Sequence, residues 1–154
     1  MFKQIGKSVM SRLGALAMLL QACWAEFGEQ ECVNGFKTNS SYDTLGSQKY
    51  IFMIATAAGQ ANQATNATSS TLLGVLQNAP KVGEAATIAF KGLSKIVAGG
   101  AVSANAIITT NASGRAAVVA SGQMAAGRLL EASGADGDVV TAQLFHPVRW
   151  TGAA

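Results

Sequence analysis

The sequence predicts a mainly β protein: a small β-barrel or sandwich of short antiparallel strands, preceded by an N-terminal helical or extended arm. Beyond residue 50, short apolar segments recur about every ten residues and are separated by glycines, which is typical of all-β domains. Glycine is frequent, with 17 residues in a chain of 154. Charged residues make up 12% of the chain, about half the share of roughly 25% in ordinary soluble domains.

The first 47 residues differ from the rest and are predicted to form an amphipathic helix or arm, followed by a linker over Asn34–Ser47. Apolar residues recur there at steps of three and four, the spacing of one helix face. This stripe consists of Phe2, Ile5, Val9, Leu13, Leu16, Leu20 and Trp24. It predicts a helix that packs against its own domain or contacts a partner. The nearly apolar stretch 13–22 is shorter than the roughly 20 residues of a membrane span.

Two alternatives stay open in this region. A basic start, a short apolar stretch and then Cys23 also resemble a secretory signal over residues 1–25, which would make the chain an exported cell-surface or envelope β-domain. Cys23 and Cys32 fit either a disulfide or two small buried thiols, and the pair alone does not decide the compartment.

Residues 48–150 are predicted as the β domain and residues 151–154 as a short tail. The expected strands are 50–54, 85–90, 93–97, 106–110, 116–120 and 139–145. Lys91-Gly92 predicts a tight turn or a bulge, and 111–114 predicts a four-residue hairpin loop with Gly114 at positive φ. The small-residue stretch 55–71 is expected to be a long loop.

A weak internal repeat supports the all-β prediction. The run 74–79, followed by Gly83-Glu84 and a strand ending at Phe90, recurs as 127–132, Gly137-Asp138 and a strand ending at Phe145. Each unit would contain a short strand, a turn with a glycine and an acid, and a longer strand. We expect the two units to pair into one small barrel, since neither has enough apolar surface alone.

The inventory of reactive side chains argues against an enzyme. One histidine and two cysteines exclude the multi-ligand zinc sites, and neither a metal nor another cofactor is expected. Gly6-Lys7-Ser8 lacks the preceding glycine and strand of a phosphate-binding loop. His146 has no acid or nucleophile near it in sequence and is expected at a surface or interface, and Asp136 and Asp138 are expected in a turn.

Binding of nucleic acid is not expected either. The net charge is only +3, and the basic residues are dispersed instead of gathered on one face. The predicted strands after Phe52 carry only Phe90 and Phe145 as aromatics, both expected in the core. A barrel that binds single strands uses stacking aromatics on its strands, so this class of function is disfavoured.

The order and spacing of several short motifs resemble the capsid cement, or head decoration, family of tailed bacteriophages over roughly residues 48–146. The matching runs are 74–80, Gly83-Glu84, 88–90 with Gly92, 98–102, 108–109, 114–116 and 127–132 with Gly137. Asn105 stands where the family often has glycine in a turn, and asparagine tolerates positive φ. The first 45 residues match nothing in the family.

The resemblance implies a structural virion protein without catalytic residues, which binds the outer surface of the capsid and clamps neighbouring major capsid subunits together. It also implies self-association, with a homotrimer expected. No nucleic acid, membrane or small-molecule substrate is expected as a partner. The low charge density suits a contact surface that loses water, because burying an unpaired charge is costly. The candidate contact residues are the N-terminal stripe together with His146, Arg149 and Trp150.

Overall fold

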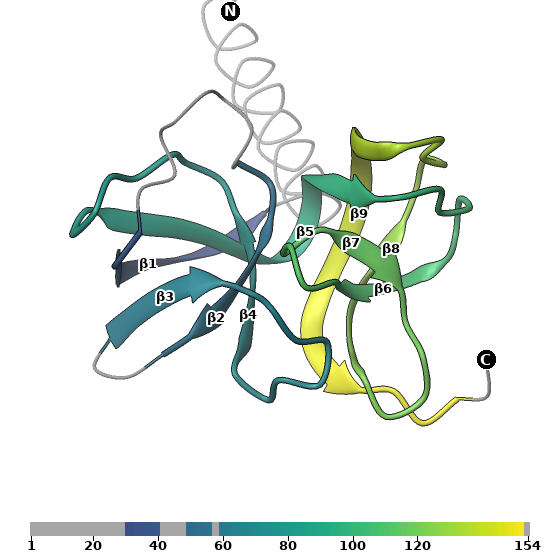
Figure 1. The fold of residues 1–154 in the computed structure, drawn as a ribbon, viewed down its shortest axis with the longest axis horizontal. Coiled ribbons are helices and arrows are strands. Elements are labelled where there is room, and N and C mark those ends of the chain that lie inside the picture. The colour runs from purple at the N-terminus through teal and green to yellow at the C-terminus, as the bar shows by residue number, and fades with distance from the viewer. Residues whose placement is uncertain (1–29, 41–48, 57–58, 153–154) are drawn as a thin grey trace, which may run out of the picture.

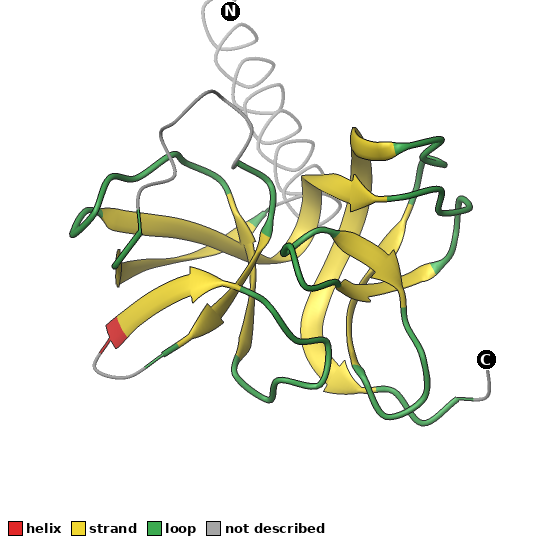
Figure 2. Ribbon diagram, viewed as in Figure 1, coloured by secondary structure: helices red, strands yellow, loops and turns green. Residues whose placement is uncertain are grey.

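A computed structural model describes residues 30–40, 49–56 and 59–152 of the chain. The regular secondary structure of the described part is mainly strand (Figure 2), which confirms the predicted fold class. The strands are β1 (Glu31–Thr38), β2 (Phe52–Ala55), β3 (Gln60–Gln63), β4 (Leu72–Leu76), β5 (Ala85–Gly99), β6 (Ile107–Thr110), β7 (Ala116–Val118), β8 (Met124–Leu129) and β9 (Asp136–Arg149).

The nine strands form one mixed sheet that closes on itself twice through β5. In the first ring, β1 pairs with β3, then follow β2, β4 and β5, which pairs back with β1. In the second ring, β5 pairs with β7, then follow β6, β8 and β9, which pairs back with β5. Figure 1 shows the two rings side by side, with β5 passing from one into the other. A closed ring leaves no continuous free edge for unwanted strand pairing.

The two rings repeat each other strand by strand and residue by residue. Strands β1 to β5 have the same neighbours in the first ring as β5 to β9 in the second, and each ring has one parallel pair, β1–β3 or β5–β7. Met53 faces Gly74 in the first ring, and Ile108 faces Gly127 in the second. The step from Gly74 to Gly127 is the predicted repeat offset, so the internal repeat is confirmed.

The turns before β2 and β6 repeat as well. Tyr50 and Asn105 are the non-glycine residues with positive φ in the described part, at 64° and 66°. The Tyr50 amide donates to the carbonyl of Leu76 at 2.8 Å, and the Asn105 amide donates to the carbonyl of Leu129 at 2.7 Å. Asn105 therefore has the positive φ that its place in the predicted turn requires.

One prediction about the repeat is wrong. The sequence predicts two units that pair into one barrel, whereas each unit closes a ring of its own. This is possible because β5 is 15 residues long and β9 is 14, longer than the predicted strands. Residues 85–90 and 93–97 are one strand, and Gly92, at φ 91°, marks the place where β5 changes from pairing with β1 to pairing with β9.

Other boundaries also differ from the sequence-based prediction. Residues 34–38 of the predicted linker belong to β1, and β3 lies inside the predicted loop 55–71. β1 and β3 pair with each other in parallel and carry few fully buried apolar side chains. Their sequences therefore lack the alternation of apolar and polar residues by which a strand is predicted. The hairpin between β6 and β7 is confirmed, with Gly114 at φ 70°.

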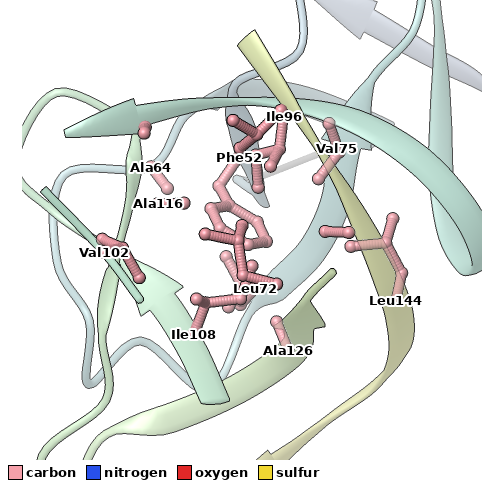
Figure 3. Packing of buried hydrophobic residues seen from close by; sticks show 14 of the residues in the cluster. Phe52, Ala64, Leu72, Val75, Ile96, Val102, Ile108, Ala116, Ala126 and Leu144 are labelled. Carbon is pink, nitrogen blue, oxygen red and sulfur yellow. The ribbon is translucent and has the colours of Figure 1, made fainter. Parts of the chain in front are cut away.

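The core consists of two clusters. The interior of the first ring holds Ile51, Met53, Ala61, Leu76, Ala86, Ile88 and Val97. The larger cluster fills the second ring and extends to the outer face of the first, as Phe52 shows at the centre of Figure 3 among Leu72, Val75, Ile108 and Leu144. Phe52 is completely buried. The outer face of β2 and β4 thus supplies part of the second ring's core.

A row of four cross-strand neighbours carries this contact, and we call it the junction row. It runs across β2, β4, β5 and β1 and consists of Phe52, Val75, Ala89 and Cys32. The first three are fully buried, and Cys32 packs against the same cluster. Its counterpart on the second ring, which we call the counterpart row, consists of Ile107, Arg128, Gln143 and Leu93. Arg128, Gln143 and Leu93 are exposed.

Candidate functional site

The acidic side chains of the described residues serve turns and ion pairs. A carboxylate oxygen of Glu84 accepts a hydrogen bond from the Lys81 amide at 2.8 Å, and Asp138 accepts one from the Ala135 amide at 2.9 Å. Asp136 forms an ion pair with Arg115. No group of three or more His, Cys, Asp or Glu side chains capable of holding a metal occurs in the described part of the chain. Glu84 lies in the turn before β5, as predicted, whereas Asp136 and Asp138 are the first and third residues of β9, so the turn predicted for them is wrong.

Three predicted contact residues lie together on the end of β9. His146 is exposed, and its ring packs edge-on against Phe90 with 6.1 Å between centroids. Arg149 is exposed and donates from Nη1 to the carbonyl of Gly122 at 3.2 Å. The backbone of Trp150 exchanges hydrogen bonds with Gly122 and Gln123. Arg149 and Trp150 thus lie beside the 121–123 turn, whereas the His146 ring lies against Phe90.

The other predicted contacts, from Phe2 to Trp24, lie outside the described residues, as does Cys23 and with it any test of the disulfide. Cys32 is partly buried on β1. Burial raises the pKa of its thiol above the usual value, so the thiol stays protonated at neutral pH and is a poor nucleophile. Within the described residues, no helix is both long and apolar enough to cross a bilayer.

A second surface, on the outside of the second ring, gathers half of the large hydrophobic side chains that are exposed in the described part of the chain. Leu93, Leu130 and Val139 are 44%, 40% and 53% exposed. They surround Thr141, which faces Lys95 across the β5–β9 pair. We call this surface the β9 face and define it as Leu93, Lys95, Leu130, Glu131, Val139 and Thr141.

A polar network occupies the middle of the β9 face. The ammonium of Lys95 donates to Oγ1 of Thr141 at 2.8 Å, and the Thr141 amide donates to a carboxylate oxygen of Glu131 at 2.8 Å. The ammonium and the Glu131 carboxylate are 3.8 Å apart. The hydrogen bonds from Thr141, side chain first, and the charge of Lys95 lower the pKa of Glu131 below its usual value. Charge and hydrophobic surface thus meet on one face.

An open groove of about 300 Å³ adjoins the β9 face where the two rings meet. Its walls are Gln30, Tyr50, Gln77, Leu93, Ser94, Lys95 and Thr141. The side-chain amide of Gln77 donates to Oγ of Ser94 at 2.9 Å and to the Val75 carbonyl at 2.9 Å. Small-molecule sites enclose most of their ligand and are mostly apolar. This groove is too open to enclose a small ligand and suits side chains of a macromolecular partner better.

The first ring offers a natural comparison for the β9 face. By strand register, Leu130 corresponds to Gln77, Val139 to Ala85, and Glu131 to Asn78. The first ring therefore carries uncharged polar or small side chains where the second ring carries exposed hydrophobics and an acid. Sequence reasoning missed this face, although an alignment of the two repeat units would have paired these residues.

The fold of this chain has a counterpart among solved structures. No protein-family model and no curated protein matches the sequence. Among solved structures, the chain is similar to the crystal structure of the head fibre gp8.5 N base of bacteriophage phi29, with a TM-score of 0.53 and 14% identity. The chain has the fold of a phage head fibre base. The match covers 75% of this chain and 94% of the phi29 chain.

This match refines the resemblance drawn from the sequence. It agrees with a fold that occurs on phage heads, and it does not single out the cement family. The shared part spans 94% of the phi29 chain, so nearly the whole of that chain takes part in the match. At 14% identity, the similarity concerns backbone architecture and transfers no residue role.

Proposed function

We propose that this chain is a structural protein of a tailed-phage virion that binds the outside of the head and stabilises it by clamping neighbouring major capsid subunits. The observation that carries the proposal is the similarity of the fold to a phage head fibre base. The cement-like order of motifs over residues 48–146 supports it independently. The proposed action is adhesion without catalysis, metal or cofactor, on the outer capsid surface.

Two of the three proposed contacts with the capsid lie on the second ring. The β9 face combines three exposed hydrophobic side chains with a lysine–glutamate pair, and such a mixture is common at protein interfaces with a polar rim. The end of β9 adds Arg149 and Trp150, whereas the ring of His146 already packs on Phe90. The N-terminal stripe from Phe2 to Trp24 is the third proposed contact, with the capsid or with sister copies in a homotrimer.

Binding to phage heads that lack this protein tests the proposal. The purified chain is mixed with such heads, and co-sedimentation and the thermal stability of the heads are measured. We expect saturable binding and a higher temperature of head disruption. Heads that neither bind the protein nor gain stability would contradict the proposed function. An intact mass lacking about the first 25 residues, as expected for a cleaved signal peptide, would favour the exported alternative.

Variants that restore first-ring residues locate the contact. Leu130→Gln combined with Val139→Ala gives the β9 face the side chains found at the same positions of the first ring, so folding is preserved. We expect weaker head binding from this variant. Val82→Ala is the control, since Val82 is 65% exposed and lies on a first-ring turn. Equal binding by both variants would remove the β9 face from the interface.

Two further variants assign the remaining contacts. A chain lacking residues 1–29 retains all nine strands, and weaker head binding or loss of self-association by this chain would assign the stripe to those contacts. Sedimentation of the full chain as a monomer would count against the homotrimer. We expect His146→Ala to leave head binding nearly unchanged, because its ring already packs on Phe90.

A further inference from the structure

One asparagine of the described chain is followed by glycine, and this pair lies at an irregular point of β1. Asn34 faces Thr87 on β5 and Phe36 faces Ala86, so Gly35 between them has no partner residue. Asn34 and Gly35 are both exposed. Gly35 has φ 113°, and a Cβ placed on it would meet nothing within 4 Å. The backbone here is bulged, open and free of steric cover.

These features favour succinimide formation. The backbone nitrogen of the residue after an asparagine attacks the side-chain carbonyl carbon, a carbon–nitrogen bond forms, and the side-chain nitrogen leaves as ammonia. Water then opens the ring at one of its two carbonyls and yields aspartate or isoaspartate. Glycine has no Cβ to hinder the attack and reaches conformations closed to other residues. Asparagine is among the thermolabile residues for this reason.

Two other asparagines of the described chain, Asn78 and Asn111, have their side chains held by hydrogen bonds. Asn78 donates to the Ala85 carbonyl at 2.8 Å and accepts from the Thr87 amide at 2.9 Å. Asn111 accepts from the amides of Ser113 and Arg115 at 2.8 and 3.0 Å. Both are followed by alanine. Their side-chain carbonyls are engaged, and the next residue carries a Cβ.

We propose that Asn34 is a site of spontaneous deamidation that ages the first ring. Isoaspartate would lengthen the backbone of β1 by one carbon between Val33 and Phe36, which both pack on the first ring's core. Since β1 pairs with both β3 and β5, the change falls on the strand that closes this ring. Either product also adds a negative charge where the second ring has Lys95. The proposal does not depend on the proposed virion function.

Peptide mass mapping of the stored full-length protein tests this inference. The protein is incubated in neutral to mildly alkaline buffer, and the conversion of each asparagine from amide to acid is followed over time, with isoaspartate detected separately. We expect Asn34 to convert several-fold faster than Asn78 and Asn111. The variant Asn34→Gln is the matched control and should release correspondingly less ammonia.

A second measurement separates reactivity from its consequence. Thermal unfolding of aged protein should shift downwards in proportion to its isoaspartate content, while aged Asn34→Gln protein should unfold as when fresh. An Asn34 that stays intact in the folded chain but converts in denaturant would show that β1 protects it, and the proposal would be wrong. Conversion of all three asparagines at the same rate would overturn it as well.

Discussion

The two rings share strand order, register and turn geometry, yet their outer faces differ in chemistry. The junction row of the first ring is apolar and buried, because the second ring's core covers it. The counterpart row of the second ring has Arg128 and Gln143 at its centre, both exposed. The same backbone position therefore carries valine or arginine according to whether a second ring lies on top. Packing between rings, rather than the ring itself, decides the residue type here.

This difference limits how the rings associate. If the second ring used its counterpart row to dock on another copy, the charge of Arg128 would be buried at considerable cost. The exposed hydrophobic side chains of the second ring lie mainly on the adjoining β9 face, which shares Leu93 with the counterpart row and where the first ring has Gln77, Asn78 and Ala85. The apolar row of the first ring is thus covered by the second ring, whereas the hydrophobic side chains of the second ring stay exposed.

Removing β1 should have the largest effect. A chain lacking residues 1–40 loses the strand that closes the first ring, and we expect it to be unfolded or strongly destabilised, because β1 pairs with both β3 and β5. A chain lacking residues 1–29 keeps every described strand and should give a folded β spectrum. Circular dichroism and thermal unfolding of both truncations check this. Equal stability of the two would mean that the first ring tolerates being open.

Exchanging side chains between the two rows should have the next largest effect. Val75→Arg places an unpaired charge in a fully buried position and should cost several kcal/mol of unfolding free energy, since charge burial is that expensive. Arg128→Val makes the reciprocal change on the exposed row and should alter the stability of the monomer by about 0.5 kcal/mol or less. Denaturant unfolding measures both changes. A small loss of unfolding free energy in Val75→Arg would show that the junction between the rings opens easily.

Adding a methyl group to each of two corresponding glycines compares the closeness of strand packing in the two rings. A Cβ on Gly74 would lie 2.1 Å from the carbonyl oxygen of Ala89, and one on Gly127 would lie 2.9 Å from that of Gln143. We expect Gly74→Ala to destabilise the protein by about 1–3 kcal/mol, as overpacking does, and Gly127→Ala by less. Chemical denaturation of the two variants ranks them. The reverse order would mean that the first ring relaxes more readily.

Much of the fold could be predicted from the sequence, and the failures have physical causes. The repeat, the hairpin at Gly114 and the positive φ of Asn105 follow from glycine and asparagine chemistry, which is local. The second closed ring could not be predicted, because it depends on β5 continuing through Gly92 and pairing with residues of both repeats. β1 and β3 could not be predicted because few of their side chains are fully buried, so their sequences do not alternate between apolar and polar residues.

The candidate site was predictable only in part. The exposure of His146 followed from its isolation in sequence, whereas the β9 face required knowledge of which side of each strand points outwards. Leu130 and Val139 look like ordinary strand residues in the sequence. Only the closed second ring places them outside, and only comparison with Gln77 and Ala85 shows that the first ring lacks them.

The smallest expected effect concerns the acid at the edge of the β9 face. Glu131 accepts the Thr141 amide in the second ring, as the uncharged Asn78 accepts the Thr87 amide in the first. The pKa of Glu131 is lowered in the folded protein, so its stabilising contribution is present above the carboxyl's unfolded value and is lost as the pH falls through and below about 4.3. Glu131→Gln keeps an acceptor without the charge and should show a shallower loss of stability in this acidic range.

Thermal unfolding across the pH range measures how steeply stability falls with pH. Asn78→Asp is the reciprocal variant in the first ring and should make this fall steeper. Identical pH profiles for wild type and Glu131→Gln would show that the carboxylate contributes no more than a neutral acceptor.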